Sequence, residues 1–384
     1  MKAIYLDHAA TTPMRPEALE AYAAAARRGP GNPSSLHAYG REARSVVTGA
    51  RDRLAAALGC RPEELVFTSG GTESDNAALY GAAWAQRLKT GRTGVVTTAV
   101  EHHAVLKACR KLEEEGFALT VLPADGDGRV STADAESAID GNTAVVSVMF
   151  GNNEVGTLQP VAEIGELAAA RGALMHTDAV QALGYVDLRL DRLPVDFASF
   201  SAHKLGGPQG VGALYIRQGA PFRPLLAGGS QERGRRAGTE NVAGIAAFAA
   251  AAEAAASARE EAGLHAARMR ERLLEGLTAR LGPDGVLVNG NPARGLPHIL
   301  NVSFPGISAD TMLMNLDLAG VAASSGSACT SGSLQPSHVL AAMGLPAERI
   351  RSAVRFSFGL GNTIEEADEA VKIIATIAAR LRNK

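Results

Sequence analysis

Short apolar runs alternate with alanine-rich amphipathic stretches between about residues 40 and 250, and this alternation constrains the fold most. The apolar runs are rich in β-branched residues and predict strands, while the longer stretches between them have the spacing of helices. Since these strands are apolar at nearly every position, we expect a mainly parallel sheet buried on both faces by helices. The expected strands cover residues 64–70, 94–100, 117–123, 143–150, 173–179, 195–203 and, as a hairpin partner, 210–217.

A long alanine-rich stretch at residues 241–281 predicts one very long helix or two joined helices. It is the expected connection to a second domain. Beyond it, short apolar runs and helical patterns indicate a smaller α+β domain. We therefore expect a large domain over residues 14–255 and a small domain built from residues 1–13 together with 256–384.

Charge and cysteine content exclude several classes of protein. The chain has 38 basic and 40 acidic residues and a net charge of −2, which argues against bulk electrostatic capture of nucleic acid or of an anionic membrane. No apolar run reaches about 18 residues, and the start of the chain does not match a secretory signal peptide. Cys60, Cys109 and Cys329 fit neither a disulfide framework nor a metal site. We expect a cytoplasmic protein with reduced thiols and no metal.

Lys204 and Asp178 indicate a cofactor site. Lys204 follows an expected strand directly, and the glycines after it leave room for a bulky group, so it is either a surface lysine or an amine that forms a Schiff base. Asp178 lies at the carboxyl end of another expected strand, where open α/β sheets bind ligands. It could cap the next segment or pair with a pyridinium nitrogen. Together the two residues favour pyridoxal 5′-phosphate.

A phosphate cradle and a stacking ring are also present in the sequence. The segment TSGGTES at 68–74 places glycines between a strand and a helix, where free amides and the helix dipole stabilise an anion. Ser201 and His203 precede Lys204 closely and could donate to the same phosphate. His102, in EHHAVL, offers a flat imidazole that is either structural or stacked on the cofactor ring.

Cys329 lies in the serine- and glycine-rich segment SSGSACTSG at 324–332, without apolar neighbours. A cysteine that fills a core lies among Val, Ile and Leu, so this one is expected to be solvated in a mobile loop at about 324–336. Thiolate is the reactive form of such a residue, but nothing in the nine residues activates it. Its task must therefore depend on another part of the chain.

The ordered motifs resemble the cysteine desulfurases of the NifS/IscS type, in the class V group of fold-type I pyridoxal phosphate enzymes. The resemblance runs nearly end to end, and each motif is only modestly specific by itself. It implies a fold-type I transferase with a mainly parallel seven-stranded sheet between helices and a smaller α+β domain. The motifs are YLDHAATTP, GNPSSLH, FTSGGTESDN, EHHAVL, NNEVGTLQP, HTDAVQ, SFSAHKLGGPQGVGALY, ERGRRAGTEN, NVSF, SSGSACTSGSLQPSHVL and VRFSFG.

The resemblance assigns roles around the cofactor ring. Lys204 would hold pyridoxal 5′-phosphate as a Schiff base, His102 would stack on the ring, and Asp178 would pair with the ring nitrogen. Asn153 and Gln181 would hydrogen-bond the side of the ring that carries the phenolic oxygen.

The resemblance also implies which residues bind the cofactor phosphate and the substrate. Thr239 would reach the phosphate of the neighbouring subunit, which implies a homodimer. Arg355 would bind the substrate carboxylate through its planar fork, unless it is an exposed strand arginine, and Asn32 would lie near the substrate. The residues implied for the phosphate of the same subunit are Gly71, Thr72, Ser201 and His203.

By the same resemblance, Lys204 would move the α-proton of L-cysteine, and the Cys329 thiolate would attack the substrate sulfur to leave L-alanine and a persulfide. The sulfur would pass to a protein acceptor for iron–sulfur cluster assembly, thio-cofactor synthesis or tRNA thiolation. The chain ends without the longer tail with which IscS-type members dock their scaffold, so the acceptor stays open. A selenocysteine lyase, a class V aminotransferase and a non-catalytic sulfur-relay protein are the alternatives.

Overall fold

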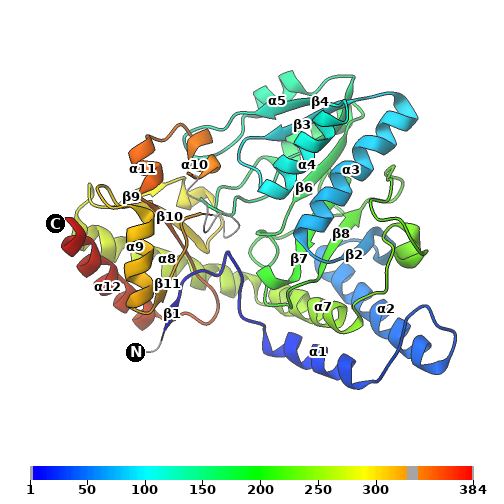
Figure 1. Cartoon of the computed structure of the whole chain (residues 1–384), viewed down its shortest axis with the longest axis horizontal. Coiled ribbons are helices and arrows are strands. Elements are labelled where there is room, and N and C mark those ends of the chain that lie inside the picture. The colour runs from blue at the N-terminus through cyan, green and yellow to red at the C-terminus, as the bar shows by residue number, and fades with distance from the viewer. Residues whose placement is uncertain (1–2, 327–335, 383–384) are drawn as a thin grey trace.

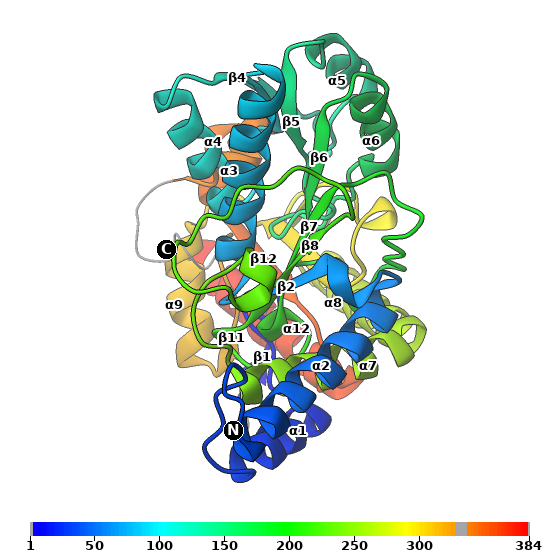
Figure 2. The ribbon, with the colours of Figure 1, turned by 90° about the vertical axis from the view of Figure 1, so that its right-hand side faces the viewer.

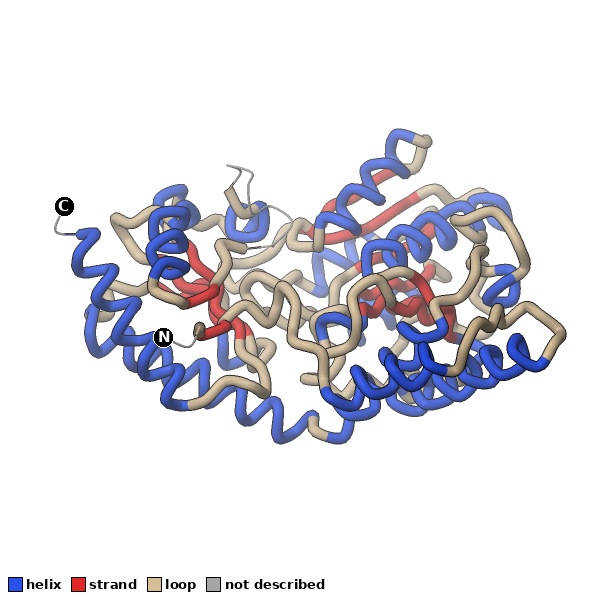
Figure 3. Tube along the Cα trace, turned by 60° about the horizontal axis from the view of Figure 1, so that its bottom comes forward, coloured by secondary structure: helices blue, strands red, loops and turns tan. Residues whose placement is uncertain are grey.

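The structure is a computed structural model that describes residues 3–326 and 336–382. Its strands form two groups, each surrounded by helices (Figures 1 and 3). The larger group is a seven-stranded sheet in the order β2-β8-β7-β6-β5-β3-β4, in which only β8 runs antiparallel to its neighbours. Its strands are β2 (Leu65–Thr68), β3 (Gly94–Thr98), β4 (Ala118–Leu122), β5 (Thr143–Ser147), β6 (Leu174–Asp178), β7 (Phe197–Ser201) and β8 (Gly212–Ile216). The predicted, mainly parallel seven-stranded sheet is confirmed.

Alternate residues of each strand contact opposite helix layers. In β3, Val95 packs in the core under α3 and α4, whereas Val96 packs in the core on the other face, which includes α2, α5, α6 and α7. Figure 2 shows α3 and α4 on one side of the sheet and α5 and α6 on the other. The helices of this unit are α1 (Pro16–Arg27), α2 (Ala38–Leu58), α3 (Gly71–Thr90), α4 (His103–Glu114), α5 (Thr132–Ala138), α6 (Val161–Ala170) and α7 (Val242–Ser257).

The smaller group has its own apolar core. An antiparallel sheet in the order β12-β10-β9 and a parallel pair β1-β11 pack with α8, α9 and α12. The pair β1-β11 brings the N-terminal segment next to residue 321, as expected if residues 1–13 belong with the C-terminal part. The elements are β1 (Ile4–Tyr5), α8 (Arg259–Leu281), β9 (Leu287–Asn289), β10 (Ile299–Ser303), α9 (Ala309–Leu318), β11 (Val321–Ala322), α10 (His338–Ala342), α11 (Ala347–Arg351), β12 (Ala353–Ser357) and α12 (Ile364–Arg382).

The stretch at 241–281 forms two helices, α7 and α8, bent by 74° at Ala258. Each helix contributes to a different core, so the bend connects the two units. Among the described residues, no single helix is long and apolar enough to cross a bilayer. The bent pair α7–α8 would pass that test by length and composition, although most residues of α7 are buried within the protein.

A buried ion pair fixes the segment that follows the seven-stranded sheet. Arg51 on α2 donates to both carboxylate oxygens of Glu232, which also accepts the backbone N–H of Phe67. The side chains of Arg51 and Glu232 are 9% and 2% exposed. The backbone of Glu232 has positive φ, a strained conformation that these bonds hold in place.

We expect Arg51→Met to lower the free energy of unfolding by about 3–5 kcal/mol, because it leaves a buried carboxylate without its partner. Arg53→Met on the same helix is the matched control, since Arg53 pairs at 3.7 Å with Glu253 and both side chains are largely exposed. Urea unfolding of the three proteins measures the effect. Equal losses in the two variants would contradict this interpretation of the Arg51–Glu232 pair.

Candidate active site

The residues that the sequence singles out for cofactor chemistry converge on one cavity of about 170 Å³. It lies beyond the carboxyl ends of β6 and β7, where the start of α3 and the N-terminal segment meet residues of both units. The predicted residues that line it are Gly71, Thr72, His102, Asn153, Asp178, Gln181, Ser201, His203, Lys204 and Arg355.

Lys204 reaches the cavity because β7 ends at Ser201 and a single 3₁₀ turn, Ala202–Lys204, follows it. Its Nζ donates to the carbonyl oxygens of Ala9 and Ala10 at 2.5 and 2.9 Å. The Ala9 carbonyl also accepts Nε2 of Gln181 at 2.9 Å. The amine is therefore directed into the cavity by the N-terminal segment, and Lys204 is not a surface lysine.

Asp178 is the last residue of β6 and is 6% exposed. Its Oδ1 accepts the backbone N–H of Val180 at 2.9 Å, so the capping interpretation and the cofactor interpretation hold together. Burial raises the pKa of Asp178 to about 6, against the opposing effects of the Val180 hydrogen bond and the Lys204 charge. A carboxyl in this position favours a positive charge opposite it, which a protonated ring nitrogen would supply.

The raised pKa of Asp178 predicts a pH-dependent cost to stability. The folded protein binds the proton more tightly than the unfolded chain, whose aspartate pKa is about 3.9, so stability is lost as pH rises through about 6. An asparagine side chain at this position cannot ionise. We expect cofactor-free Asp178→Asn to be more stable than cofactor-free wild type by about 2–3 kcal/mol at pH 7.5 and equally stable at pH 4.

Urea unfolding at the two pH values measures this difference, with Asp52→Asn on the exposed side of α2 as the control for losing one carboxylate. A stability gain of the same size at both pH values would show that Asp178 is not ionised at a cost in the folded protein.

The start of α3 forms an anion cradle. The helix begins at Gly71 without a side-chain cap, which leaves first-turn N–H groups available for a ligand. A Cβ on Gly71 would lie 2.8 Å from Cγ2 of Val180, so only glycine permits this close approach. His203 has its pKa lowered to about 4, first by burial and then by Lys204, and is a neutral donor or acceptor. These groups fit a phosphate.

The side chains of His102 and His103 have different surroundings in the structure. His102 caps α4 by accepting the N–H of Ala104 at Nδ1, and its ring lines the cavity. Burial, and after it the charge of Lys204, lowers the pKa of His102 to about 4, so the ring is neutral. His103 instead packs against His338 with ring centroids 4.4 Å apart. Of the two, only His102 is placed to stack on a cofactor.

Arg355 lies in β12 and is 1% exposed, so the interpretation as an exposed strand arginine is wrong. Nη1 donates to the carbonyl oxygen of Asn153 at 2.7 Å, and Nη2 donates to Oδ1 of Asp7 at 2.9 Å. Within the described residues its buried Nε has no hydrogen-bond partner. The guanidinium is thus fixed at the cavity wall with a donor left for an anionic ligand.

Three acidic residues of the site were missed by sequence reasoning. Asp7 pairs with Arg355, and Asp75 lines the cavity. Burial raises the pKa of Asp75 well above its usual range and that of Glu101 to about 8, so Glu101 is protonated near neutral pH. Asp75 and Asp7 lie within quoted motifs, but their burial is set by tertiary packing.

Two of the predicted residues do not line this cavity. Asn32 and Thr239 are not among the residues that line this cavity of the single chain. Cys329, with most of the loop expected at 324–336, lies outside the described residues. Cys60 and Cys109 have their thiol pKa values raised to about 12, chiefly by burial, and are unreactive. Cys60 lies just beyond the C-cap of α2.

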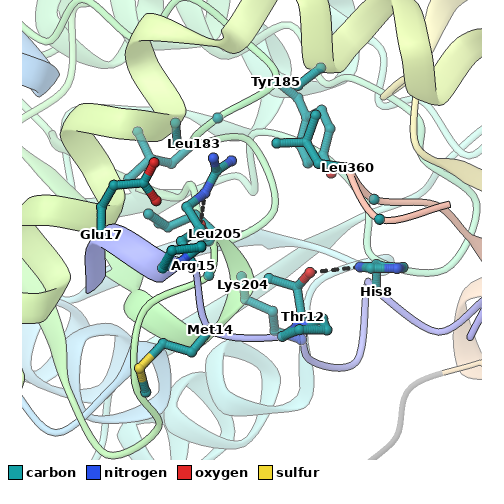
Figure 4. A pocket seen from close by; sticks show the side chains of 18 residues that line it. His8, Thr12, Met14, Arg15, Glu17, Leu183, Tyr185, Lys204, Leu205 and Leu360 are labelled. Atoms are coloured by element: carbon teal, nitrogen blue, oxygen red, sulfur yellow. Dashed lines mark hydrogen bonds between the residues drawn. The ribbon is translucent and has the colours of Figure 1, made fainter. Parts of the chain in front are cut away.

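A second cavity, of about 380 Å³, lies behind Lys204 (Figure 4). The N-terminal segment, the 183–185 turn and residues 359–361 surround it. Arg15 donates from Nε to the Leu205 carbonyl, and His8 bonds to Thr12 across this space. Lys204 is the one predicted site residue it shares with the first cavity, so the predicted chemistry is concentrated in the first.

Comparisons with known proteins agree with this geometry. The family described as Aminotransferase class-V matches residues 4–369. A putative cysteine desulfurase IscS 1 of Bacillus subtilis is 48% identical over 99% of this chain and 100% of its own length. The cysteine desulfurase IscS of Methanosarcina thermophila is 45% identical over 100% of this chain and 93% of its own.

Solved structures give the same result. A NifS-like protein superposes with a TM-score of 0.92 at 38% identity, covering 98% of this chain and 100% of that one. A structure described as SspA in complex with cysteine has a TM-score of 0.81 at 33% identity, covering 93% and 99%. The chain belongs to the class-V aminotransferase family and, within it, to the cysteine desulfurases.

Proposed function

We propose that this protein removes sulfur from L-cysteine to give L-alanine and a persulfide on Cys329. The observation that carries the proposal is the convergence of Lys204, Asp178 and Arg355, from three separate elements, on one cavity. An amine, a buried acid and a fixed guanidinium are the groups needed to hold an amino acid and to act at its α-carbon. The relative in complex with cysteine supports that amino acid as the substrate.

Members of this family depend on pyridoxal 5′-phosphate, and the cavity fits it. The uncapped start of α3 with Gly71 and Thr72 would hold the phosphate, together with Ser201 and His203. Asp178 would face the ring nitrogen, His102 would stack on the ring, and Lys204 would hold the group covalently. When bound, the cofactor supplies an electron sink for the substrate α-carbon. Asn153 and Gln181 also line the cavity and would orient the ring.

The remaining steps belong to side chains of this protein. Arg355 would bind the substrate carboxylate, and Lys204 would remove the α-proton and later return a proton to the product. The Cys329 thiolate would attack the substrate sulfur, so that an S–S bond forms as the C–S bond breaks. The electron pair of the C–S bond stays with the three-carbon fragment. In sum, L-cysteine and the Cys329 thiol give L-alanine and the Cys329 persulfide, without an external oxidant.

Several further assignments complete the proposal. Thr239 lies outside the cavity of its own chain, which leaves it available to the phosphate site of a second subunit in a homodimer, and Asn32 would lie near the substrate. The two apolar cores support a large domain over 14–255 and a small domain over 1–13 and 256–384. A cytoplasmic enzyme that passes sulfur to a protein acceptor, such as an iron–sulfur scaffold, fits the reduced thiols that the chemistry needs.

Product analysis of the purified holoenzyme with wild-type and Cys329→Ser chains tests the function. We expect L-alanine and reducible sulfur from L-cysteine in the wild type, and loss of both in Cys329→Ser. Alanine formed from selenocysteine by Cys329→Ser would be compatible with the proposal. Conversion of L-cysteine to a keto acid by both proteins would identify an aminotransferase and overturn it.

A further inference from the structure

The two described ends that flank residues 327–335 approach one carboxylate, that of Glu154. Ser337 Oγ donates to Glu154 Oε2 at 2.6 Å. On the other end, a Cβ added to Gly326 would lie 3.0 Å from the same oxygen. Both described ends therefore lie close to the same side chain, and Ser337 is hydrogen-bonded to it.

Glu154 is itself firmly held. The residue is 2% exposed, and its backbone N–H donates to Oδ1 of Asn152 at 2.8 Å. Its carbonyl oxygen accepts Nδ2 of Asn301 on β10 at 3.1 Å. Because Asn152 and Asn301 fix the backbone on both sides, the carboxylate extends from a fixed point.

The same ends are attached to residues of the active site. Ser324 pairs with Arg355 through both backbone hydrogen bonds, at 2.6 and 3.1 Å. His338, next to Ser337, donates from Nε2 to the carbonyl oxygen of Glu101, the residue before His102. The carbonyl of Asn153, adjacent to Glu154, accepts Nη1 of Arg355. Glu154 thus lies in a continuous set of contacts between the flanking ends and the cavity wall.

We infer that Glu154 is a positioning residue for sulfur transfer, because it holds Ser337, close to where the described chain resumes after the Cys329 segment, beside the active site. The inference rests on the proposed function, in which Cys329 accepts the sulfur. Fixing Ser337 fixes one attachment point of the Cys329 segment, and reaction rates depend steeply on the placement of the reacting groups. Substrate binding by Arg355 and Lys204 does not require this contact.

The experiment compares Glu154→Gln, Glu154→Ala and Ser337→Ala in the holoenzyme. Single-turnover mass spectrometry gives the rate of persulfide formation on Cys329, and the cofactor absorbance gives the affinity for L-alanine. We expect Glu154→Ala and Ser337→Ala each to slow persulfide formation by about 10-fold or more, with affinity for L-alanine changed less than about twofold. Glu154→Gln keeps an acceptor oxygen for Ser337 and should retain most of the rate.

The double variant Glu154→Ala/Ser337→Ala tests whether the two single variants lose rate through the same hydrogen bond or for two unrelated reasons. If the Glu154–Ser337 hydrogen bond is responsible, the double alanine variant is no slower than either single variant. Ser308→Ala is the matched control, because Ser308 caps α9 as Ser337 caps α10, but its hydroxyl bonds to Thr311 whereas that of Ser337 bonds to Glu154. It should leave the rate unchanged.

The outcomes distinguish failure of the positioning role of Glu154 from failure of the proposed desulfurase function. Wild-type rates in Glu154→Ala and Ser337→Ala, or equal losses of rate and of L-alanine affinity, would overturn the positioning role while leaving desulfuration intact. Absence of a Cys329 persulfide in the wild type would instead overturn the proposed function. Should Glu154→Ala fail to fold, Ser337→Ala and Glu154→Gln still decide the question.

Discussion

Replacing Lys204 by alanine is expected to lower the rate of L-alanine formation from L-cysteine by at least about 10³-fold, because one amine serves as covalent anchor and as proton carrier. Its Nζ is directed into the cavity by the carbonyl oxygens of Ala9 and Ala10. Lys204 is the only lysine among the residues that line this cavity in the described part of the chain. No neighbouring amine in that lining is therefore placed to take over.

The measurement is amino-acid analysis of timed reactions with pyridoxal 5′-phosphate in excess. Lys107→Ala, on the exposed side of α4, is the control and should retain the wild-type rate. A Lys204→Ala protein with about a tenth of the wild-type rate would mean that another group moves the α-proton.

Arg355→Leu is expected to raise KM for L-cysteine by about 10- to 100-fold, because a charge-assisted hydrogen bond to a carboxylate contributes about 1.5–3 kcal/mol and each 1.4 kcal/mol is about tenfold in affinity. The guanidinium is 1% exposed and held by Asp7 and Asn153, so its direction is fixed before substrate arrives. Arg355→Lys keeps the charge but loses the planar fork, and we expect an intermediate KM.

Arg355→Leu also leaves Asp7 without its ion-pair partner, so the thermal stability of the variant must be measured separately. Asp7→Asn removes the same pair while keeping the guanidinium, so it should lower Tm without the full rise in KM. If KM rises equally in Asp7→Asn and Arg355→Leu, the guanidinium acts through the fold rather than on the substrate.

Much of the fold could be predicted because its pattern is local. Continuous apolar strands such as 143–150 and the intervening helices follow from the spacing of side chains along a few turns. The bend between α7 and α8 could not be located, because Ser257, Ala258 and Arg259 carry no glycine or proline signal. What separates the helices is that each side of Ala258 packs into a different core.

The site residues that follow directly from strand ends could be predicted. Those whose role depends on burial in the folded protein could not. Lys204 and Asp178 each end or follow a strand, and the structure brings both to one cavity. Asp75 lies in a helical motif, and its pKa is raised by burial and by the nearby Asp178, which only tertiary packing brings about. The Asp7–Arg355 pair joins residues separated by 348 positions, which no local pattern encodes.

Mass spectrometry of the holoenzyme after brief incubation with L-cysteine tests the central claim most directly. The account predicts one added sulfur on the peptide that contains Cys329, removed by a reducing agent, with one L-alanine formed for each sulfur bound. The peptides of Cys60 and Cys109 should stay unmodified, since burial keeps both thiols protonated. Abundant L-alanine beside an unmodified Cys329 peptide would contradict the account.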